Sequence, residues 1–553
     1  MEKESVDMRE TKRHSLRSAA VLVSALALVI AACGGGDTGD TTAPAAPSGE
    51  TNGEADAPAD GEPQRGGTLT IAYQRDVLQL DASVLTTEPT PPRLAIFETL
   101  FALDEGNIPQ PALATSAEVS SDGLTWTFQL RPGVKFHDGQ EFTSADVVAS
   151  YERFLNVGRM APLFKNNGNA EFVATGPLTV EARLTEPYGA FLEAVAAMSG
   201  SFIMLPEAIA TANVDNDELT IPELIGTGPY KVQEFIPDNR TVLVRYDDYV
   251  KHEGEASYLA GAREAYFDEI VIRHIEDDGA RVAALLAGEV DMIFPLPADD
   301  VVRVAEDPDV DSTVTTPGAR VYIKFNPTIA PFNDPLVREA VRTAIDPDEL
   351  MIGFGDPEFF NVDHTPRYQE GQGLWVDQSE YYPNDLDAAK ELMTQSTYDG
   401  ETIILLAGSD RVDFPMAIAL QQTLQRLGMD VEVRVVDGAT FGAVRADVTA
   451  WNIKPSGGGS LVGVTYLDSS GIDRTNTPWP GVPDSWYEAL DAVKNTSTLE
   501  ERKAAASVVY DIHAEMNYEM WIGSVYLNAA YASDLRNVPP MDTLPFWNIW
   551  RAS

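Results

Sequence analysis

The sequence predicts an α/β fold, and the alternation of helix and strand patterns along the chain is the main reason. From Gly66 to the C-terminus, segments with the two-residue alternation of a strand follow segments with the periodicity of a helix. Residues 402–406 and 431–436 have strand patterns on either side of a helix at 415–427, which Gly428 ends. Such a βαβ unit predicts at least one parallel pair of strands.

The composition limits the classes of protein to which this chain can belong. It has 553 residues with 44% hydrophobic side chains, enough for about two to four domains with their own cores. The formal net charge of −47 opposes binding to phosphate backbones, so we expect no nucleic-acid partner. A single cysteine excludes an intrachain disulfide and a metal site with several cysteine ligands.

That cysteine follows a segment typical of export signals. Basic residues within 1–17 precede an uninterrupted run of apolar or small residues at 18–32, shorter than the about 20 residues of a membrane-spanning helix. The run ends in Ile-Ala-Ala before Cys33 and resembles a bacterial lipobox. We therefore expect residues 1–32 to be a lipoprotein signal peptide and Cys33 to carry a lipid. Residues 33–65 have no aromatic or large aliphatic side chain, which predicts a flexible acidic tether.

Local patterns predict further elements in the body of the chain. Residues 68–73 are a strand candidate after two glycines, and residues 124–130 alternate with period two after a Ser-Asp-Gly turn. Thr143 and Asp146 have the spacing of a capping box, and the apolar residues after them fall on one helix face. Another helix is expected from Asp334, with proline in its first turn.

Residues for catalysis or metal binding are not evident in the sequence. It has no His-Glu-x-x-His motif and no Gly-x-Ser-x-Gly elbow, and the glycines at 226–228 lack the lysine and hydroxyl residue of a phosphate-binding loop. The histidines are scattered, at His14, His137, His252, His274, His364 and His513. We therefore expect no enzyme, no catalytic residue, no cofactor and no metal site, while a zinc site assembled from distant positions stays open.

The pair His137-Asp138 has two interpretations. Asp138-Gly139 is a typical turn after a strand, and Phe136 and Phe142 are core candidates on either side, so we expect a structural role. A functional His137 is the alternative.

Several motifs carry a resemblance to a known family. The most specific is Ser-Asp-Gly-Leu-Thr-Trp-Thr-Phe-Gln-Leu-Arg-Pro-Gly-Val-Lys-Phe-His-Asp-Gly at 121–139, followed by Phe-Thr-Ser-Ala-Asp-Val-Val at 142–148. Further motifs are Gly-Thr-Gly-Pro-Tyr-Lys at 226–231, Ala-Gly-Glu-Val-Asp at 287–291, Phe325-Asn326, the helix at 334–346 and Asp-Ala-Ala-Lys-Glu-Leu at 387–392. In this order they resemble the extracellular solute-binding proteins of the peptide and nickel ABC-importer family, over nearly all of 66–553.

The resemblance implies a bilobed periplasmic-binding-protein-like fold, in which a hinge joins two Rossmann-like lobes and an extra α/β domain is inserted in the first. Carried over to this chain, lobe I comprises 66–95, 220–322 and 516–553, the extra domain 96–219, and lobe II 323–515. We also expect a monomer.

The resemblance also implies ligand-binding residues. In peptide-binding relatives, an aspartate that pairs with the ligand's free amine follows a tryptophan that matches Trp451. Here Asn452, Lys454, Gly457 and Gly458 follow, and the first acid is further on. A free amine would lose a charge-assisted partner, so a sugar, an anionic or zwitterionic metabolite, or a ligand held by glycine N–H groups fits better. Plain core packing is the alternative for Trp451.

Two further groups are weaker candidates for the ligand site. Tyr73, Gln74 and Arg75 end the first predicted strand, where α/β proteins bind ligands at the carboxyl ends of strands. Tyr526 and Asn528 lie in a strand that the family analogy places near the hinge. A core or surface role is the alternative for each.

The expected function is that of a lipid-anchored receptor on the outer face of a bacterial membrane, in the periplasm or at the cell surface. It would close on a small solute, peptide-like, a sugar or another metabolite, and deliver it to an ABC import permease. An exported lipoprotein hydrolase is one alternative, and a cell-surface scaffold or sensor without transport is another.

Overall fold

The computed structural model describes residues 62–77, 79–84, 91–196, 202–354, 357–366, 368, 370–409, 414–458, 479–496, 498–541 and 544–553. They belong to one compact unit, Asp60–Ser553. The predicted signal peptide at 1–32, Cys33 and most of the predicted tether lie outside the described residues. Among the helices that are described, none has both the length and the apolar character needed to cross a membrane.

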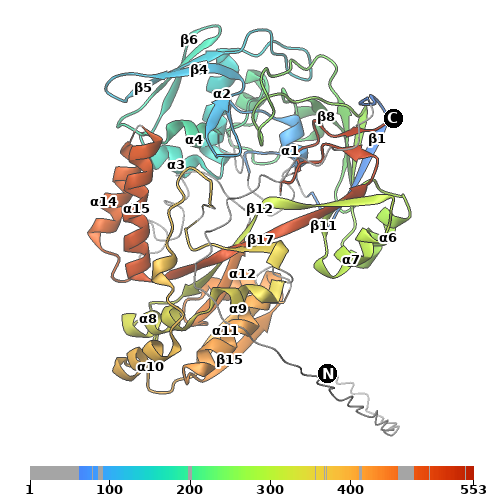
Figure 1. The fold of residues 1–553 in the computed structure, drawn as a ribbon. Helices are drawn as coiled ribbons and strands as arrows, with labels where there is room; N and C mark the ends of the chain where they lie inside the picture. The colour runs from blue at the N-terminus through green and yellow to red at the C-terminus, as the bar shows by residue number, and fades with distance from the viewer. Residues whose placement is uncertain are drawn as a thin grey trace, which may run out of the picture. The chain divides into compact units, whose positions relative to one another are not determined.

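One large mixed sheet organises the described part of the chain (Figure 1). Its order is β15-β14-β16-β12-β17-β11-β1-β10-β9-β8, with β13 paired to β17 beside this path. The bounds are β15 Val431–Val436, β14 Ile403–Gly408, β16 Ile453–Gly458, β12 Val310–Phe325, β17 Glu519–Ala532, β13 Phe360–Val362, β11 Met292–Leu296, β1 Thr68–Tyr73, β10 Glu269–His274, β9 Arg240–Arg245 and β8 Tyr230–Ile236.

Parallel pairs lie toward both ends of this sheet. β1 runs parallel to β10 and to β11, and β14 runs parallel to β15 with Ile403 opposite Val431. The helix between β14 and β15 is α11, Phe414–Arg426, which ends before Gly428 at a φ of 83°. The βαβ unit and its parallel pair, predicted from the sequence, are therefore confirmed.

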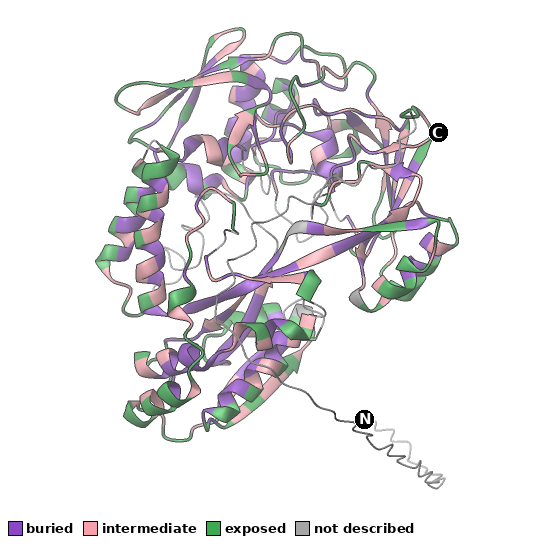
Figure 2. Cartoon of the chain, viewed as in Figure 1, coloured by how far each residue is buried: buried purple, intermediate pink, exposed green. Residues whose placement is uncertain are grey.

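Two long antiparallel strands, β12 and β17, run side by side through the middle of this unit (Figure 1). Their ladder extends from Val310 opposite Ala532 to Lys324 opposite Glu519, with register shifts between Thr315 and Ala319 and between Val321 and Tyr322. Figure 2 shows β17 mostly in the colour of buried residues. This pair connects the strands on its two sides into one sheet.

A separate antiparallel sheet has the order β4-β5-β7-β6, and two strand pairs, β2-β3 and β18-β19, lie apart from both sheets. The bounds are β4 Ala114–Val119, β5 Thr125–Leu130, β7 Thr179–Arg183, β6 Glu171–Gly176, β2 Phe101–Leu103, β3 Pro109–Pro111, β18 Leu535–Arg536 and β19 Trp550–Arg551. β1 and β5 confirm the strands predicted at 68–73 and 124–130.

Two helices, α2 and α8, begin where their capping residues predict. α2, Ser144–Val157, follows Thr143, whose N–H donates to the Asp146 carboxylate at 2.7 Å in a complete capping box. α8, Pro335–Ala344, follows Asp334, which accepts from the Leu336 N–H at 2.9 Å. The other α-helices are α1 Pro91–Ile96, α3 Ala161–Asn166, α4 Phe191–Ala196, α5 Glu207–Ala212, α6 Asp278–Leu286, α7 Val301–Ala305, α9 Pro347–Met351, α10 Leu386–Gln395, α12 Gly438–Ala446, α14 Asp484–Asn495 and α15 Leu499–Met516. Short 3₁₀ helices are η1 Ile221–Glu223, η2 Ala298–Asp300, η3 Ile352–Phe354, η4 Pro357–Phe359 and η5 Ser379–Tyr381.

Three main hydrophobic cores support these elements. One lies around β1, β9 and β10, and another between β12, β14 and the helices α8, α9 and α11. The third joins the small sheet and α2 to α14 and α15, with Phe128, Trp486 and Tyr510 among its buried members. The predicted boundaries of the lobes and the extra domain stay a prediction.

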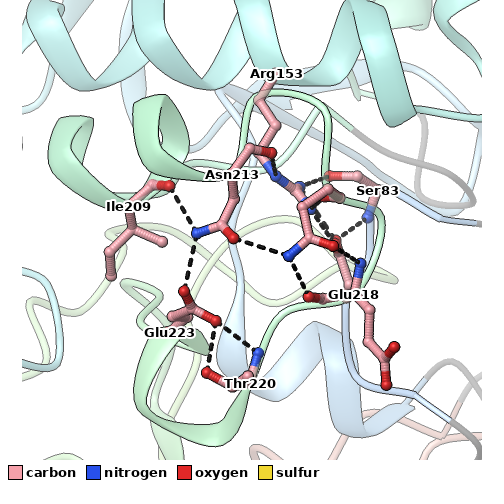
Figure 3. A network of polar contacts seen from close by, with 9 residues as sticks. Ser83, Arg153, Ile209, Asn213, Glu218, Thr220 and Glu223 are labelled. Atoms are coloured by element: carbon pink, nitrogen blue, oxygen red, sulfur yellow. Dashed lines mark hydrogen bonds and ion pairs between the residues drawn. The ribbon is translucent and has the colours of Figure 1, made fainter.

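A buried polar network ties the segment after β1 to the end of α2 (Figure 3). The Arg153 guanidinium forms an ion pair with Asp81, and both side chains are 1% exposed. Its Nε donates to the Asn213 carbonyl at 3.1 Å, and Ser83 N–H donates to Asp81 at 3.0 Å. A charge buried this deeply is tolerated because every partner is in place.

The contacts of His137 explain its place in the fold. Its Nε2 lies 3.0 Å from the Gly228 carbonyl, and its Nδ1 accepts from the Gly226 N–H at 3.2 Å. Both ring nitrogens are therefore engaged, and the ring meets Tyr246 edge-on at 5.1 Å. A Cβ on Gly226 would come within 2.0 Å of the Ile96 carbonyl oxygen, so the turn needs glycine there. These contacts favour the structural role of His137.

The first prediction concerns the buried ion pair. Asp81→Ala leaves the Arg153 charge buried without its carboxylate, so the free energy of unfolding in urea should fall by about 3–5 kcal/mol. The matched control is Arg183→Ala, which removes an ion pair to Glu181 at 2.8 Å whose side chains are 51% and 27% exposed. That loss should be about 1 kcal/mol or less. Equal small losses in the two variants would contradict the structural role given to the Asp81 pair.

The second prediction is a pH dependence of stability. Burial lowers the pKa of His137 to about 4, so the folded chain binds this proton less readily than the unfolded chain does. His137 therefore stabilises the fold above its ordinary pKa of about 6.5, and this contribution of about 3 kcal/mol is lost as the pH falls toward 4. His137→Gln should flatten the dependence of the unfolding free energy on pH between 6.5 and 4.

Tyr246→Phe is the control for this prediction. It removes the hydroxyl that donates to the Phe136 carbonyl at 2.7 Å, but no group that titrates between pH 4 and 6.5. Its unfolding free energy should be lower at every pH, with the slope of the wild-type chain. A His137→Gln slope that matches the wild type would refute the assignment.

Candidate ligand-binding site

The two faces of the C-terminal half of β12 differ in chemistry. Val321, Ile323 and Phe325 are fully buried in the core formed with α8, α9 and α11. The opposite face carries Arg320 and Lys324 on either side of Tyr322. A strand places alternate residues on opposite faces, so these three large polar side chains lie in one row.

The neighbouring strands continue this row. On β16, Gly458, Ser456 and Lys454 lie opposite Arg320, Tyr322 and Lys324, in that order. On β17, Ser524, Trp521 and Glu519 lie opposite the same three residues. We call these nine residues of β16, β12 and β17 the polar face.

Two lysines stand directly opposite each other on the polar face. The Lys454 ammonium donates to the Ser456 hydroxyl at 2.5 Å and lies 5.5 Å from the centre of the Trp451 ring. The Lys324 ammonium forms an ion pair with Glu519 at 2.8 Å and lies 4.8 Å from the Trp479 ring. Like charges opposite one another on a sheet repel, and burial strengthens the repulsion.

Glu519 is 3% exposed, and its charge balances part of this cluster. Burial alone raises the pKa of its carboxyl, but Lys324 and His513, whose Nε2 lies 3.8 Å from the carboxylate, together outweigh that effect and hold the pKa well below its ordinary value. Glu519 is therefore ionised at neutral pH and pairs with Lys324.

At the other end of the polar face, Arg320 is held in a buried network. Its guanidinium donates to the Ser524 hydroxyl at 2.9 Å and lies 3.7 Å from the Asp363 carboxylate. That carboxylate also accepts from the Thr365 N–H at 2.9 Å and from the Trp375 ring N–H at 3.1 Å. Between the two charged ends, the rings of Tyr322 and Trp521 stack at 4.4 Å. Aromatic rings flanked by charged groups are suited to contact a small polar ligand.

The structure places the sequence-predicted Trp451 and Asn452 beside the polar face, in supporting roles. Trp451 is 2% exposed, and its ring N–H donates to the Arg445 carbonyl at 3.2 Å. The Asn452 side chain accepts from the Ile404 N–H at 2.8 Å and donates to the Ala330 carbonyl at 2.8 Å. Asn452 thus bonds to the backbone of two other segments, while Trp451 contributes its ring to the surroundings of Lys454.

The predicted Gly457, Gly458 and Tyr526 lie on the central strands. Gly457 pairs with Val321 and Gly458 with Arg320, so both glycines belong to the β12–β16 ladder. Tyr526 is half-buried where the β12–β17 register shifts, and burial raises the pKa of its hydroxyl.

The remaining predicted residues lie further along the sheet from the lysines. Asn528 is in β17, and Tyr73, Gln74 and Arg75 are at the end of β1, beyond β11. Tyr73 is opposite Phe294 of β11, and Asn528 is opposite Leu296 of the same strand. Among the described residues, neither the buried Tyr73 hydroxyl nor Asn528 Oδ1 has a hydrogen-bond partner. Gln74 donates to Asp278 at 3.3 Å, and Arg75 is exposed. The structure therefore brings Tyr73 near Asn528 through β11, but not next to Trp451.

Sequence reasoning missed Arg320, Lys324 and Glu519, and it noted Lys454 without assigning it a role. A signal was present for β12, because large polar residues at 320, 322 and 324 alternate with apolar residues at 321, 323 and 325. Nothing local to Glu519 or Lys454 indicates that they meet Lys324, since register between distant strands decides this.

Comparisons with known proteins identify the family of the chain. The model of the middle region of bacterial extracellular solute-binding proteins, family 5, matches residues 109–469. A probable peptide ABC transporter periplasmic-binding protein, y4tO, of Sinorhizobium fredii is 28% identical over 484 residues, 83% of this chain and 88% of that protein. The glutathione-binding protein GsiB of Pectobacterium atrosepticum is 30% identical over 373 residues, 66% of this chain and 67% of that protein.

Solved structures share the fold. The binding protein DppA from Helicobacter pylori, in complex with peptide STSA, has a TM-score of 0.72 at 23% identity, over 89% of this chain and 99% of that chain. AgaA from A. tumefaciens, in complex with agropinic acid, has a TM-score of 0.70 at 24% identity, over 88% and 99%. This likeness confirms the predicted α/β fold of the bilobed periplasmic-binding-protein type. The chain belongs to the bacterial extracellular solute-binding proteins of family 5.

Proposed function

We propose that this protein is a lipid-anchored receptor that closes its two lobes over a small solute and presents it to an ABC import permease. Membership of the extracellular solute-binding family supports the receptor role. The Ile-Ala-Ala-Cys33 sequence after an apolar run supports the anchor. In this proposal, lobe I comprises 66–95, 220–322 and 516–553 and carries the extra domain at 96–219, and lobe II is 323–515.

Closure requires a flexible connection between the lobes, and β12 and β17 supply it in this proposal. Their ladder is interrupted between Thr315 and Ala319, opposite Tyr526. A strand bends most easily where ladder hydrogen bonds are missing. The interruption separates two parts of β12. The part before it pairs with the half of β17 that also pairs with β11, and the part after it forms the polar face.

The solute in this proposal carries a negatively charged group, such as a carboxylate, that binds between Lys324 and Lys454. The pairing of Lys324 with Lys454 across the β12–β16 ladder is the observation that carries this step. An anion bound by both lysines would accept two charge-assisted hydrogen bonds, each worth about 1.5–3 kcal/mol. The rings of Trp451, Trp479 and Tyr322 would cover the apolar part of the solute.

The solutes named for the relatives are consistent with this choice. GsiB is a glutathione-binding protein, DppA was solved with a peptide, and AgaA with agropinic acid. A zwitterionic or acidic peptide-like metabolite would resemble the solutes named for these relatives and would also suit the lysines of this chain. A peptide recognised through its amine is disfavoured, because Lys454 would repel that amine.

The third prediction tests the lysine site. Saturation with a bound solute at 100 times its Kd should add about 2.7 kcal/mol of apparent stability, visible as a raised Tm. We expect such a rise with glutathione or acidic dipeptides and none with neutral disaccharides. Lys454→Met should weaken the binding of the positive probe about 10- to 100-fold by calorimetry, the equivalent of one charge-assisted hydrogen bond.

Lys165→Met, a change at an exposed lysine of α3, is the control and should leave the Kd unchanged. Equal affinity in the wild type and Lys454→Met would contradict the proposed lysine site but not the receptor role. The receptor role itself fails if no probe raises the Tm and mass spectrometry of the native protein finds no carried solute. Turnover of a probe under those conditions would favour the hydrolase instead.

The fourth prediction concerns the anchor. Cys33→Ala removes the sulfur that would carry the lipid, so the protein should move from the membrane fraction to the soluble fraction. Ser48→Ala, in the same predicted tether, should leave the protein in the membrane fraction. Membrane fractionation and the mass of the N-terminal peptide check both variants. A Cys33→Ala protein that stays with membranes would contradict the anchor.

A further inference from the structure

Three metal-ligating side chains from separate segments meet at the edge of lobe I. Asp76 follows β1, Asp238 lies in the turn between β8 and β9, and His274 ends β10. One ligand atom from each lies within 4.8 Å of the other two. Asp238 is exposed, and Asp76 and His274 are half-buried, so an ion can reach the cluster from solvent.

The sheet explains why these residues meet. Tyr73 of β1 is opposite His274 in the parallel pair β1–β10, so the carboxyl ends of both strands lie together. The β8–β9 turn is attached to the same edge, because the His274 N–H donates to the Asn239 carbonyl at 3.0 Å. The Asp238 N–H also donates to the Asp76 carboxylate at 2.5 Å, with Asp238 at a left-handed φ of 57°.

A second contact orients the histidine for a metal. His274 Nε2 lies 3.1 Å from the Gln74 carbonyl oxygen. A carbonyl oxygen only accepts, so Nε2 carries a proton and Nδ1 is the ring nitrogen left for a metal. Metal-bound histidines usually donate their other ring N–H to a carbonyl or carboxylate in this way. This contact is independent of the two carboxylates and gives the ring the tautomer that a ligand needs.

We propose that Asp76, Asp238 and His274 bind a divalent transition-metal ion of the Zn²⁺ class. One imidazole nitrogen and two carboxylate oxygens are typical ligands for Zn²⁺, with water completing the tetrahedron. Calcium and magnesium prefer oxygen ligands throughout, so the imidazole selects against them. The net charge of −47 raises the local concentration of cations around the molecule. The bound ion would fasten the β8–β9 turn to the ends of β1 and β10.

This site lies apart from the polar face and does not depend on the identity of the solute. The test uses the full chain without a polyhistidine tag, titrated with Zn²⁺ in a calorimeter after chelator treatment. We expect one strong site per chain, a raised Tm with Zn²⁺, and a shift of the His274 Nδ1 resonance in nitrogen-15 NMR. His274→Ala should weaken the binding about 100-fold or more, and Asp238→Asn, at an exposed position, should weaken it by at least about 10-fold.

Asp299→Asn, a change at an exposed acid of η2, is the matched control and should keep the Kd of the wild type. Zn²⁺ binding that survives His274→Ala would assign the ion to another site and overturn the proposal. Tighter binding of Ca²⁺ than of Zn²⁺ would overturn the metal class. An unchanged Nδ1 resonance on saturation with Zn²⁺ would show that His274 is no ligand, whatever the effect of its substitution.

Discussion

The antiparallel pairing of β12 with β17 is the contact on which the rest of the large sheet depends. β12 pairs on its other side with β16, and β17 pairs on its other side with β11. In the described chain, this ladder therefore joins two groups of strands: β14–β16 on one side, and β1 with β8–β11 on the other. A bond from the Thr315 hydroxyl to the Leu527 carbonyl at 2.5 Å strengthens it next to the interruption. Any movement of one set of strands against the other has to bend these two strands.

The polar face follows from the same strands. One side of β12 must be apolar to complete the core with α8, α9 and α11, so alternation leaves its other side for charged groups. Buried ion pairs add little net stability, because desolvation offsets their attraction, yet removal of one partner is costly. The pairs Arg320–Asp363 and Lys324–Glu519 therefore explain how the charges are tolerated rather than why they are present. In the proposed function, recognition of a solute would give these charges a role that stability alone does not.

Local patterns predicted the elements well, and long-range register decided the rest. The capping box of α2 and the βαβ unit of β14, α11 and β15 depend on neighbours in sequence, so the sequence was sufficient to predict them. Lys324 meets Lys454 and Glu519 from positions 130 and 195 residues away, through ladders whose register no local pattern specifies. Asn452 was a ligand candidate by its place after Trp451, but its amide bonds to Ile404 and Ala330, which are distant in sequence. The cluster of His274 with Asp76 and Asp238 was not predicted for the same reason, because contacts between segments distant in sequence bring these residues together.

In the proposed mechanism of closure, the positions of the two lysines limit which solutes can drive it. Lys324 and Lys454 lie on adjacent paired strands, so their separation stays the same when the lobes move. An anion that touches only these lysines binds equally well to the open and closed forms, and such a ligand shifts no equilibrium. A solute that closes the lobes therefore needs a second group that reaches the other side, where Tyr73 and Asn528 have buried polar atoms without partners among the described residues. An acid with a polar group at its other end meets both conditions, while a simple inorganic anion meets only the first.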